Sequence, residues 1–300
     1  MERTSPFGVA PTPWRGYLEL LKPVTWFPPM WAFGCGLVAC GANVGSRGWF
    51  VAGGIALAGP HVCGTSQVVN DWFDRHVDAI NEPQRPIPSG RVGGNRAVHF
   101  AILWTVVSLI VAALLGKWVF LAAVFGLALA WAYSAPPARL KLNGWWGNGA
   151  VAICYEGLPW FTAAAALTGA LPSWHSLFAA LAYSVGAHGI MTLNDFKAIE
   201  GDRKMGVRSL PVQLGVKGAA RQACAVMGGA QLAVIAMLVY LGTPLHAGGV
   251  AALLVAQLVL MRRFLTDPVK HDTWFSAYGV TLYVSGMLVT AFAIRQVLVS

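Results

Sequence analysis

The chain has 300 residues, of which 56% are hydrophobic and only 11% are charged, with 21 Lys and Arg against 12 Asp and Glu. Since a soluble protein carries roughly a quarter charged residues, this composition excludes an ordinary water-soluble fold and indicates a surface that mostly faces lipid. The net charge of +9 does not predict nucleic-acid binding. The basic residues lie in short segments between apolar stretches, where membrane orientation and anionic ligands account for them.

The apolar stretches predict membrane-crossing helices along the whole chain. A crossing helix needs about 20 mainly apolar residues, and helices satisfy their own backbone polar groups in lipid. A polar arm at 1–23, without a signal-peptide pattern, precedes nine such stretches. They are 24–44, 50–70, 97–115, 118–135, 147–168, 175–195, 222–242, 247–264 and 274–298. We therefore expect an all-α integral membrane bundle that forms a single domain at 24–300.

The distribution of basic residues predicts the orientation of this bundle. If the N-terminus is cytoplasmic, every Lys and Arg except Arg47, Lys117 and Arg295 belongs to the cytoplasmic side. Because cytoplasmic loops carry an excess of basic residues, the sequence predicts a cytoplasmic N-terminus and an outer C-terminus.

The second predicted span ends in an acidic run. Asn70 is followed by Asp71, Asp74 and Asp78, and the three carboxylates fall within about 60° of one another around a helix. Like charges at this spacing destabilise an isolated helix, so we expect a cation between them. Carboxylate oxygens are the ligands that Mg²⁺ prefers, usually together with substrate phosphates.

The sixth predicted span ends in a second acidic run, in which Asp195 and Asp202 share a helix face. Both runs start with Asn-Asp, and a basic, proline-containing turn follows each, at 85–88 and 208–211. The chain is therefore predicted to contain two related four-helix halves plus one helix. This repetition favours a joint metal and diphosphate site over the alternative that the acids are solvated loop charges paired with nearby arginines.

These motifs resemble those of the UbiA superfamily of intramembrane prenyltransferases. The family pattern NDxxDxxxD starts here at Asn70, the second aspartate-rich motif resembles 195–202, and a third shared loop is YSAPPARLK at 133–141. The resemblance covers essentially the whole chain. One departure is Ala198, which stands where many members carry a further Asp and removes one metal ligand.

Longer strings resemble the chlorophyll and bacteriochlorophyll synthases of that superfamily. They lie at 26–33, 80–91 and 195–203, and Ala198 is expected in this subgroup. The string at 154–160 favours the bacteriochlorophyll branch. The resemblance implies transfer of a C20 isoprenyl group, geranylgeranyl or phytyl, from its diphosphate to the propionate of a chlorophyllide or bacteriochlorophyllide, with Mg²⁺ as cofactor.

The resemblance also implies roles for individual residues. The implied metal ligands are Asn70, Asp71, Asp74, Asp78, Asp195 and Asp202, and all of these except Asp71 are also implied to be catalytic. The implied diphosphate-binding residues are Arg75, Arg139, Lys141 and Arg203, with Arg85 and Arg208 as further candidates. For each basic residue the alternative is a charge that only sets membrane topology.

The acceptor needs a wide apolar site but no general base, because a carboxylic acid is already ionised at neutral pH. The pigment-binding candidates are Trp26, Phe27 and Trp31, against the alternative that they form an interfacial aromatic belt. His61 and His188 either contact the central Mg²⁺ of the pigment or only pack in the bundle. A further acid, Glu156, is costly in lipid and should face protein or a cavity; its role stays open.

Two other functions compete with this interpretation. A prenyltransferase for a quinone precursor or a glycerophosphate lipid would carry related loops. A transporter would also have many spans and buried acids, but its coupling residues tend to lie near the bilayer midplane, whereas these acids lie at one face. We expect a bacterial inner-membrane enzyme with its active site on the cytoplasmic side, and other pigment-biosynthesis or pigment-binding membrane proteins are candidate partners.

Overall fold

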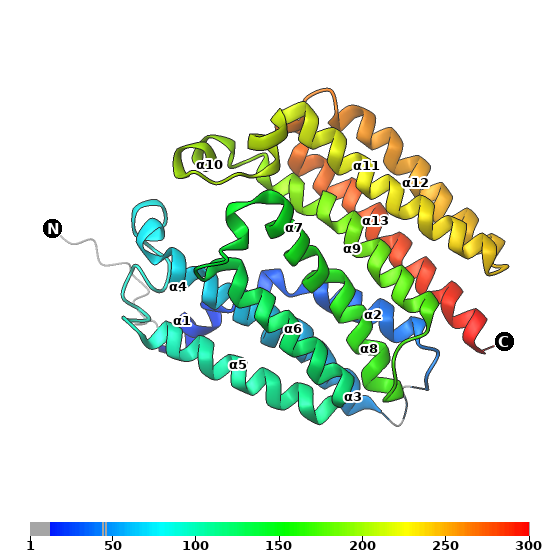
Figure 1. Ribbon diagram of the computed structural model, residues 1–300, viewed down its shortest axis with the longest axis horizontal. Helices are drawn as coiled ribbons and strands as arrows, with labels where there is room; N and C mark the ends of the chain where they lie inside the picture. Colours follow the sequence, from blue (N-terminus) through cyan, green and yellow to red (C-terminus); the bar gives the residue numbers. More distant parts are fainter. Residues whose placement is uncertain (1–12, 44, 46, 300) are drawn as a thin grey trace, which may run out of the picture.

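The computed structural model describes residues 13–43, 45 and 47–299, and these residues form the helical bundle of Figure 1. The first twelve residues of the predicted arm lie outside the described residues. In the described part the extended backbone pairs only at an isolated bridge between Asn143 and Arg208. The prediction of an all-α protein is confirmed.

The helices follow one another with short connections. In chain order they are α1 (Pro13–Leu20), η1 (Pro23–Thr25), α2 (Phe27–Ala39), α3 (Gly48–Ala56), η2 (Leu57–Cys63), α4 (Gly64–Asn81), α5 (Arg96–Leu115), α6 (Lys117–Ser134), η3 (Leu140–Leu142), α7 (Gly144–Ala152), η4 (Ile153–Gly157), α8 (Leu158–Thr168), α9 (Trp174–Asp195), α10 (Ile199–Met205), α11 (Leu210–Tyr240), α12 (Pro244–Phe264) and α13 (Pro268–Val299).

Seven helical segments of the described chain are long and apolar enough to cross a membrane. They are α5, α6, the run from α7 to α8, α9, α11, α12 and α13, and they match the predicted spans from 97–115 onward. The first two predicted spans look different. The segment 24–44 contains α2, whose 13 residues span about 20 Å, less than the hydrocarbon core of about 30 Å. The segment 50–70 falls within α3, η2 and α4.

The bundle has two groups of helices that meet along α2 and α8. Helices α9, α11, α12 and α13 pack together on one side, while α4, α5 and α6 pack together on the other (Figure 1). The two central helices touch closely because Gly36 on α2 lacks a side chain. A Cβ atom at this position would lie 2.3 Å from the carbonyl oxygen of Trp160 on α8, so the contact needs glycine.

The two acidic motifs lie at the same end of the bundle. Helix α10, which carries Asp202 of the second motif, and the C-terminal half of α4, which carries the first motif, both lie away from the C-terminus of the chain (Figure 1). Helix α1 packs against α4 at this end. The fold therefore gathers the polar segments at one end of a bundle whose remainder is apolar.

Candidate active site

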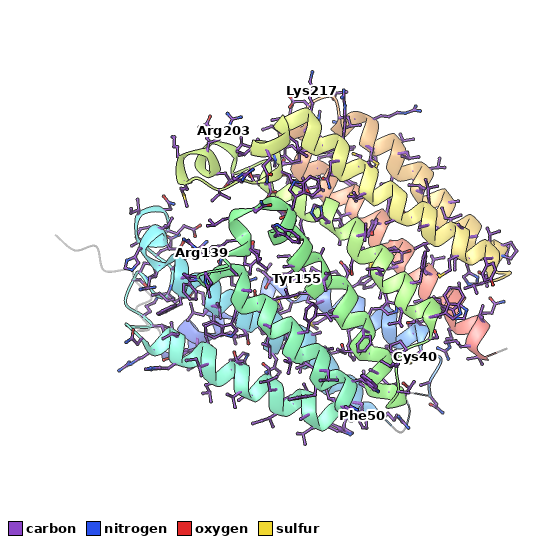
Figure 2. All side chains as sticks on the ribbon, in the orientation of Figure 1. Cys40, Phe50, Arg139, Tyr155, Arg203 and Lys217 are labelled. Carbon is purple, nitrogen blue, oxygen red and sulfur yellow. The ribbon has the colours of Figure 1, made fainter. Side chains whose placement is uncertain are left out.

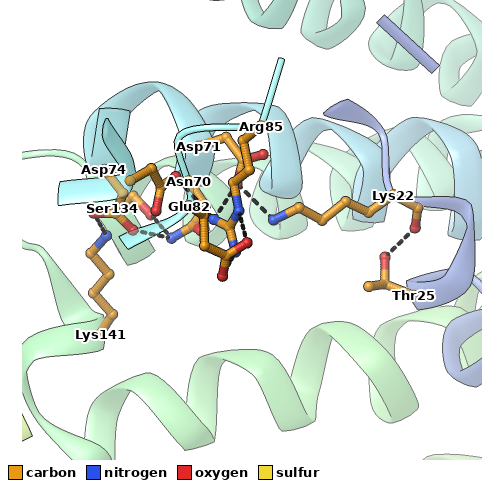
Figure 3. A network of polar contacts seen from close by, with 10 residues as sticks. Lys22, Thr25, Asn70, Asp71, Asp74, Glu82, Arg85, Ser134 and Lys141 are labelled. Atoms are coloured by element: carbon orange, nitrogen blue, oxygen red, sulfur yellow. Dashed lines mark hydrogen bonds and ion pairs between the residues drawn. The ribbon is translucent and has the colours of Figure 1, made fainter. Parts of the chain in front are cut away.

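The first acidic motif is held by hydrogen bonds that link α4 to α6 and to the loop after α6. The side-chain amide of Asn70 donates to Oδ2 of Asp74 at 3.1 Å and to Oγ of Ser134 at 3.2 Å. On the other side of the same carboxylate, Nζ of Lys141 donates to Oδ1 of Asp74 at 2.5 Å (Figure 3). Asn70 and Lys141 therefore fix the direction of the Asp74 carboxylate, and Ser134 on α6 holds Asn70 in place.

Asp71 belongs to a separate ion-pair network (Figure 3). It is only 2% exposed, and its Oδ1 accepts a hydrogen bond from Lys22 at 2.6 Å. Burial raises the pKa of the Asp71 carboxyl above its ordinary value, although Lys22 and Arg85 act in the opposite direction. Arg85 also lies 2.9 Å from Asp78 and pairs with both carboxylate oxygens of Glu82. This network joins Lys22, which precedes η1, to α4 and the turn that follows α4.

The second acidic motif has fewer compensating contacts. Asp195 ends α9 and accepts a hydrogen bond at 3.1 Å from the side-chain amide of Asn148 on α7. Asp202 lies on α10. In the part of the chain that the structure describes, neither Asp195 nor Asp202 has a basic partner within ion-pair distance. Both carboxylates instead line a cavity, which is described below.

A backbone bridge ties the third loop to the segment after α10. The amide of Gly144 donates to the carbonyl of Arg208 at 2.8 Å, and the amide of Arg208 donates to the carbonyl of Leu142 at 2.8 Å. Gly144 permits this approach because a Cβ atom there would lie 2.6 Å from the backbone nitrogen of Leu210. The bridge holds the loop that carries Arg139 against the second acidic motif.

A polar cavity of about 420 Å³ brings the two motifs together. Helices α4, α7, α9 and α10 and the loop after α6 all contribute to its wall. The predicted site residues that line it are Asn70, Asp74, Asp78, Arg139, Lys141, Asp195 and Asp202. We call this space the polar cavity. It unites two motifs that lie more than a hundred residues apart in the sequence.

The other predicted site residues do not line the polar cavity. Asp71 and Arg85 belong to the ion-pair network described above. Arg75 donates to the carbonyl of Trp72 at 2.7 Å and lies over its ring at 4.5 Å. Arg203 is exposed on α10, at the outer edge of the molecule in Figure 2. Arg208 takes part in the backbone bridge but is not among the lining residues.

A second, larger cavity of about 600 Å³ adjoins the polar one and extends between the helices. The two cavities share Asn70, Tyr133, Asn148 and Asp195. Away from this shared wall the lining is mostly apolar and comes from η1, α2, α4, α7, η4, α9 and α13. We call this space the apolar cavity. Its volume is typical of a site for an organic ligand.

Two of the three predicted pigment-binding residues line the apolar cavity. Phe27 and Trp31 lie on its wall and stack on each other with ring centroids 6.0 Å apart. The indole N–H of Trp31 donates to the carbonyl of Val284 at 3.1 Å, which fixes the ring against α13. Trp26 is not in the wall. Its indole N–H donates to the carbonyl of Leu21 at 2.8 Å, and its ring packs among α1, α4 and α5.

The two intramembrane histidines have neighbours of their own. His61 stacks on Trp104 with ring centroids 5.1 Å apart. His188 lies 3.2 Å from the side chain of Gln222 and 3.3 Å from the carbonyl of Trp145. Neither histidine lines the apolar cavity or the polar cavity.

Sequence reasoning missed Asn148 and Tyr133 as individual wall residues. Both line the polar and the apolar cavity, and Asn148 also orients Asp195. Asn148 carried a usable signal, since it is a polar residue inside an apolar predicted span. The role of Lys22 as the partner of Asp71 had no such signal in the sequence, because the two residues are 49 positions apart along the chain.

The donor set of the polar cavity suits a hard divalent cation. Among the described residues no three His, Cys, Asp or Glu side chains converge closely enough to form a complete protein cage. The cavity instead offers four separate carboxylates and the carbonyl of Asn70. Oxygen-only donors favour Mg²⁺ or Mn²⁺, and Mg²⁺ is usually bound by one or two carboxylates together with substrate phosphates. The residues therefore fit a cation whose coordination a diphosphate would complete.

Comparison with known proteins gives a consistent result. The family model described as the UbiA prenyltransferase family matches residues 26–288. The bacteriochlorophyll synthase 33 kDa chain of Cereibacter sphaeroides is 59% identical over 94% of this chain and 93% of its own length. The chloroplastic chlorophyll synthase of Oryza sativa is 40% identical over 93% of this chain and 77% of its own length.

A solved structure shows the same fold. The UbiA homolog from Archaeoglobus fulgidus, determined with DMAPP and Mg²⁺ bound, matches with a TM-score of 0.70 and 20% identity, over 89% of this chain and 98% of that one. The geometry of the site, the family model and the relatives agree, and the chain belongs to the UbiA prenyltransferase family.

Proposed function

We propose that this prenyltransferase transfers a C20 isoprenyl group from its diphosphate to the propionate carboxylate of a bacteriochlorophyllide. The observation that carries the proposal is the junction of the two cavities at Asn70, Tyr133, Asn148 and Asp195. A diphosphate fits the charged side of this junction and a hydrophobic acceptor fits the other. The 59% identity with a bacteriochlorophyll synthase supports this acceptor over a quinone precursor or a glycerophosphate lipid. Membership of an enzyme family favours an enzyme over a transporter.

The polar cavity would hold the diphosphate. Arg139 and Lys141 would donate hydrogen bonds to its oxygens, and such charge-assisted bonds are the strong ones. Asn70, Asp74, Asp78, Asp195 and Asp202 would hold Mg²⁺, which supplies positive charge that stabilises the leaving diphosphate. Because Asn70, Asp74 and Asp195 are already oriented by Ser134, Lys141 and Asn148 respectively, these three groups need little reorganisation as charge develops.

The acceptor carboxylate needs no proton transfer before it attacks. An ordinary carboxylic acid has a pKa of about 4 and is ionised at neutral pH, so the protein must position it and exclude water from the allylic cation. The apolar wall formed by Phe27, Trp31, Val280 and Val284 serves both purposes. Flat aromatic side chains provide contact area for a rigid macrocycle.

We further propose nine membrane crossings, in which the segment 24–44, formed by η1 and α2 together, and the segment 50–70, within α3, η2 and α4, complete the set. The distribution of Lys and Arg supports a cytoplasmic N-terminus and a cytoplasmic position of both acidic motifs. The identity with a bacterial relative supports a bacterial inner membrane. The Asn-Asp pairs in the middle of α4 and at the end of α9 support two related halves within one domain at 24–300.

Purified protein tests the proposal directly. With a bacteriochlorophyllide, geranylgeranyl diphosphate and Mg²⁺, we expect an esterified pigment, and a chelator should abolish its formation. Phytyl diphosphate in a parallel reaction identifies the preferred donor. Failure to esterify the pigment, while another acceptor is prenylated at the same diphosphate concentration, would contradict the assignment of the acceptor.

A further inference from the structure

Glu156 is an acidic residue that the proposed chemistry does not use. It lies in η4, a π-helical turn near the middle of the crossing segment Gly144–Thr168, and is 5% exposed. Ionisable side chains within membrane spans are costly and usually functional, and π-helical turns are frequent at functional sites. The position therefore calls for a group that compensates the carboxyl.

The protein does not supply that group. Oε2 of Glu156 is buried and has no hydrogen-bond partner among the described residues. Tyr183 and Tyr283 lie near Glu156, but their hydroxyl groups are engaged elsewhere. The hydroxyl of Tyr283 donates to the carbonyl of Tyr183 at 2.9 Å, and the hydroxyl of Tyr183 lies 2.7 Å from that of Thr290.

Glu156 lines the apolar cavity. It follows Asn148, at the junction of the two cavities, by eight residues along one helical run. A helical rise of 1.5 Å per residue separates these positions by about 12 Å. This separation is comparable with the width of a tetrapyrrole macrocycle together with its propionate arm. A pigment whose propionate reaches the junction would place its opposite rim near Glu156.

The chemistry of the two substrates decides which one Glu156 faces. An isoprenyl tail is a hydrocarbon and would leave the carboxyl without a partner. A bacteriochlorophyllide carries carbonyl groups on its rim, including an acetyl group on the half opposite the propionate. In an apolar environment a carboxyl without a counter-ion is far less costly when uncharged, and the uncharged form has one O–H donor.

We propose that Glu156 is a specificity residue that donates a hydrogen bond to the rim acetyl carbonyl of the acceptor. The inference rests on the proposed function and adds to it the feature by which the site distinguishes pigments. A pigment with a vinyl group in place of the acetyl group has no acceptor oxygen there. Binding it would leave the Glu156 carboxyl buried and unpaired.

Two acceptors and two variants test this role. With wild-type protein we expect kcat/KM to favour the acetyl pigment over the matching vinyl pigment by about two- to tenfold, the effect of one neutral hydrogen bond. Glu156→Leu removes the donor, so the ratio should fall to about one while the KM for the isoprenyl diphosphate stays unchanged. Glu156→Gln, which is nearly isosteric and retains an N–H donor, should keep the ratio above one.

The comparison within one variant separates recognition from folding, because a damaged protein loses activity toward both pigments alike. An identical ratio in wild-type protein and Glu156→Leu would overturn the inference and leave the proposed function standing. A changed KM for the isoprenyl diphosphate in Glu156→Leu, with an unchanged ratio of kcat/KM for the two pigments, would also overturn the inference. It would mean that the isoprenyl tail occupies this end of the cavity. If the wild-type protein esterified neither pigment, the proposed function itself would fail.

Discussion

The two acidic motifs have similar sequences but different surroundings. In the first motif, basic side chains contact every aspartate: Lys22 and Arg85 at Asp71, Lys141 at Asp74, and Arg85 at Asp78. In the second motif, Asp195 accepts hydrogen bonds from the side-chain amide of Asn148 and the backbone amide of Leu210. The described residues offer neither Asp195 nor Asp202 an ion pair. Basic side chains of the protein therefore compensate the charge of the first motif but not that of the second.

This difference separates structural acids from ligand-binding acids. A buried carboxylate that pairs within the protein supports the fold, because removing either partner leaves an uncompensated charge. A carboxylate that faces a cavity is free to coordinate a cation. We propose that Asp71 belongs to the structural class and Asp195 to the ligand-binding class. Asp74 and Asp78 combine both features, since they contact Lys141 and Arg85 respectively and also line the polar cavity.

The largest effect should come from removing one cavity-facing carboxylate in either motif. Asp74→Ala and Asp195→Ala should each reduce the rate to below about a tenth of the wild-type value, because loss of a ligand costs at least as much as loss of the groups that orient it. Initial rates of pigment esterification measure this. Glu200→Ala is the matched control, since Glu200 is exposed on α10 and does not line the cavity. Its rate should equal that of the wild type.

The next effect concerns the basic side chains. Lys141→Met should raise the KM for the isoprenyl diphosphate by about tenfold, because a hydrogen bond to a charged group contributes about 1.5–3 kcal/mol. Arg203→Met removes a basic residue outside the polar cavity and should leave this KM nearly unchanged. If both substitutions raised this KM equally, lining the polar cavity would not distinguish the basic residues that bind the diphosphate from those that do not.

A smaller effect should follow from loss of the amide that orients Asp195. Asn148→Ala removes the 3.1 Å hydrogen bond and should raise the Mg²⁺ concentration needed for half-maximal activity several-fold, since partners of metal ligands tune metal affinity. Titration of activity with Mg²⁺ at saturating substrates measures this. An unchanged Mg²⁺ requirement would argue that Asp195 does not bind the cation.

The smallest effect on rate should come from Asp71. Asp71→Ala leaves Lys22 without its partner and should lower the melting temperature by several degrees, with a smaller loss of rate than Asp74→Ala shows. Thermal unfolding of both variants, followed together with activity, tests the division into two classes. A stable but inactive Asp71→Ala protein would place Asp71 among the ligand-binding acids.

The sequence predicted the long helices and the convergence of the motifs well. Runs of about 20 apolar residues leave the chain few alternatives in lipid, so the spans from 97–115 onward agree with the structure. The pairing of the two motifs followed from their repetition and from their common position at the ends of spans. The first two spans were less predictable, because α2 is short and the run from α3 to α4 ends in charged residues.

The direction of side chains could not be predicted from spacing alone. From the sequence, Trp26, Phe27 and Trp31 were equally good candidates for the pigment site. In the structure Trp26 precedes α2 and its indole contacts Leu21, whereas Phe27 and Trp31 line the apolar cavity. The ion pair between Lys22 and Asp71 joins segments whose approach depends on the whole fold. Charge type was predictable from the sequence, and the partner of each charge was not.

Whether the two motifs hold one diphosphate is tested most directly by binding without turnover. A non-reactive isoprenyl diphosphate analogue can be titrated calorimetrically into wild-type protein, Asp74→Ala and Asp195→Ala, each with and without Mg²⁺. We expect Mg²⁺-dependent binding to the wild type and at least about tenfold weaker binding to both variants. Wild-type affinity in either variant, or binding that does not depend on Mg²⁺, would contradict a shared site.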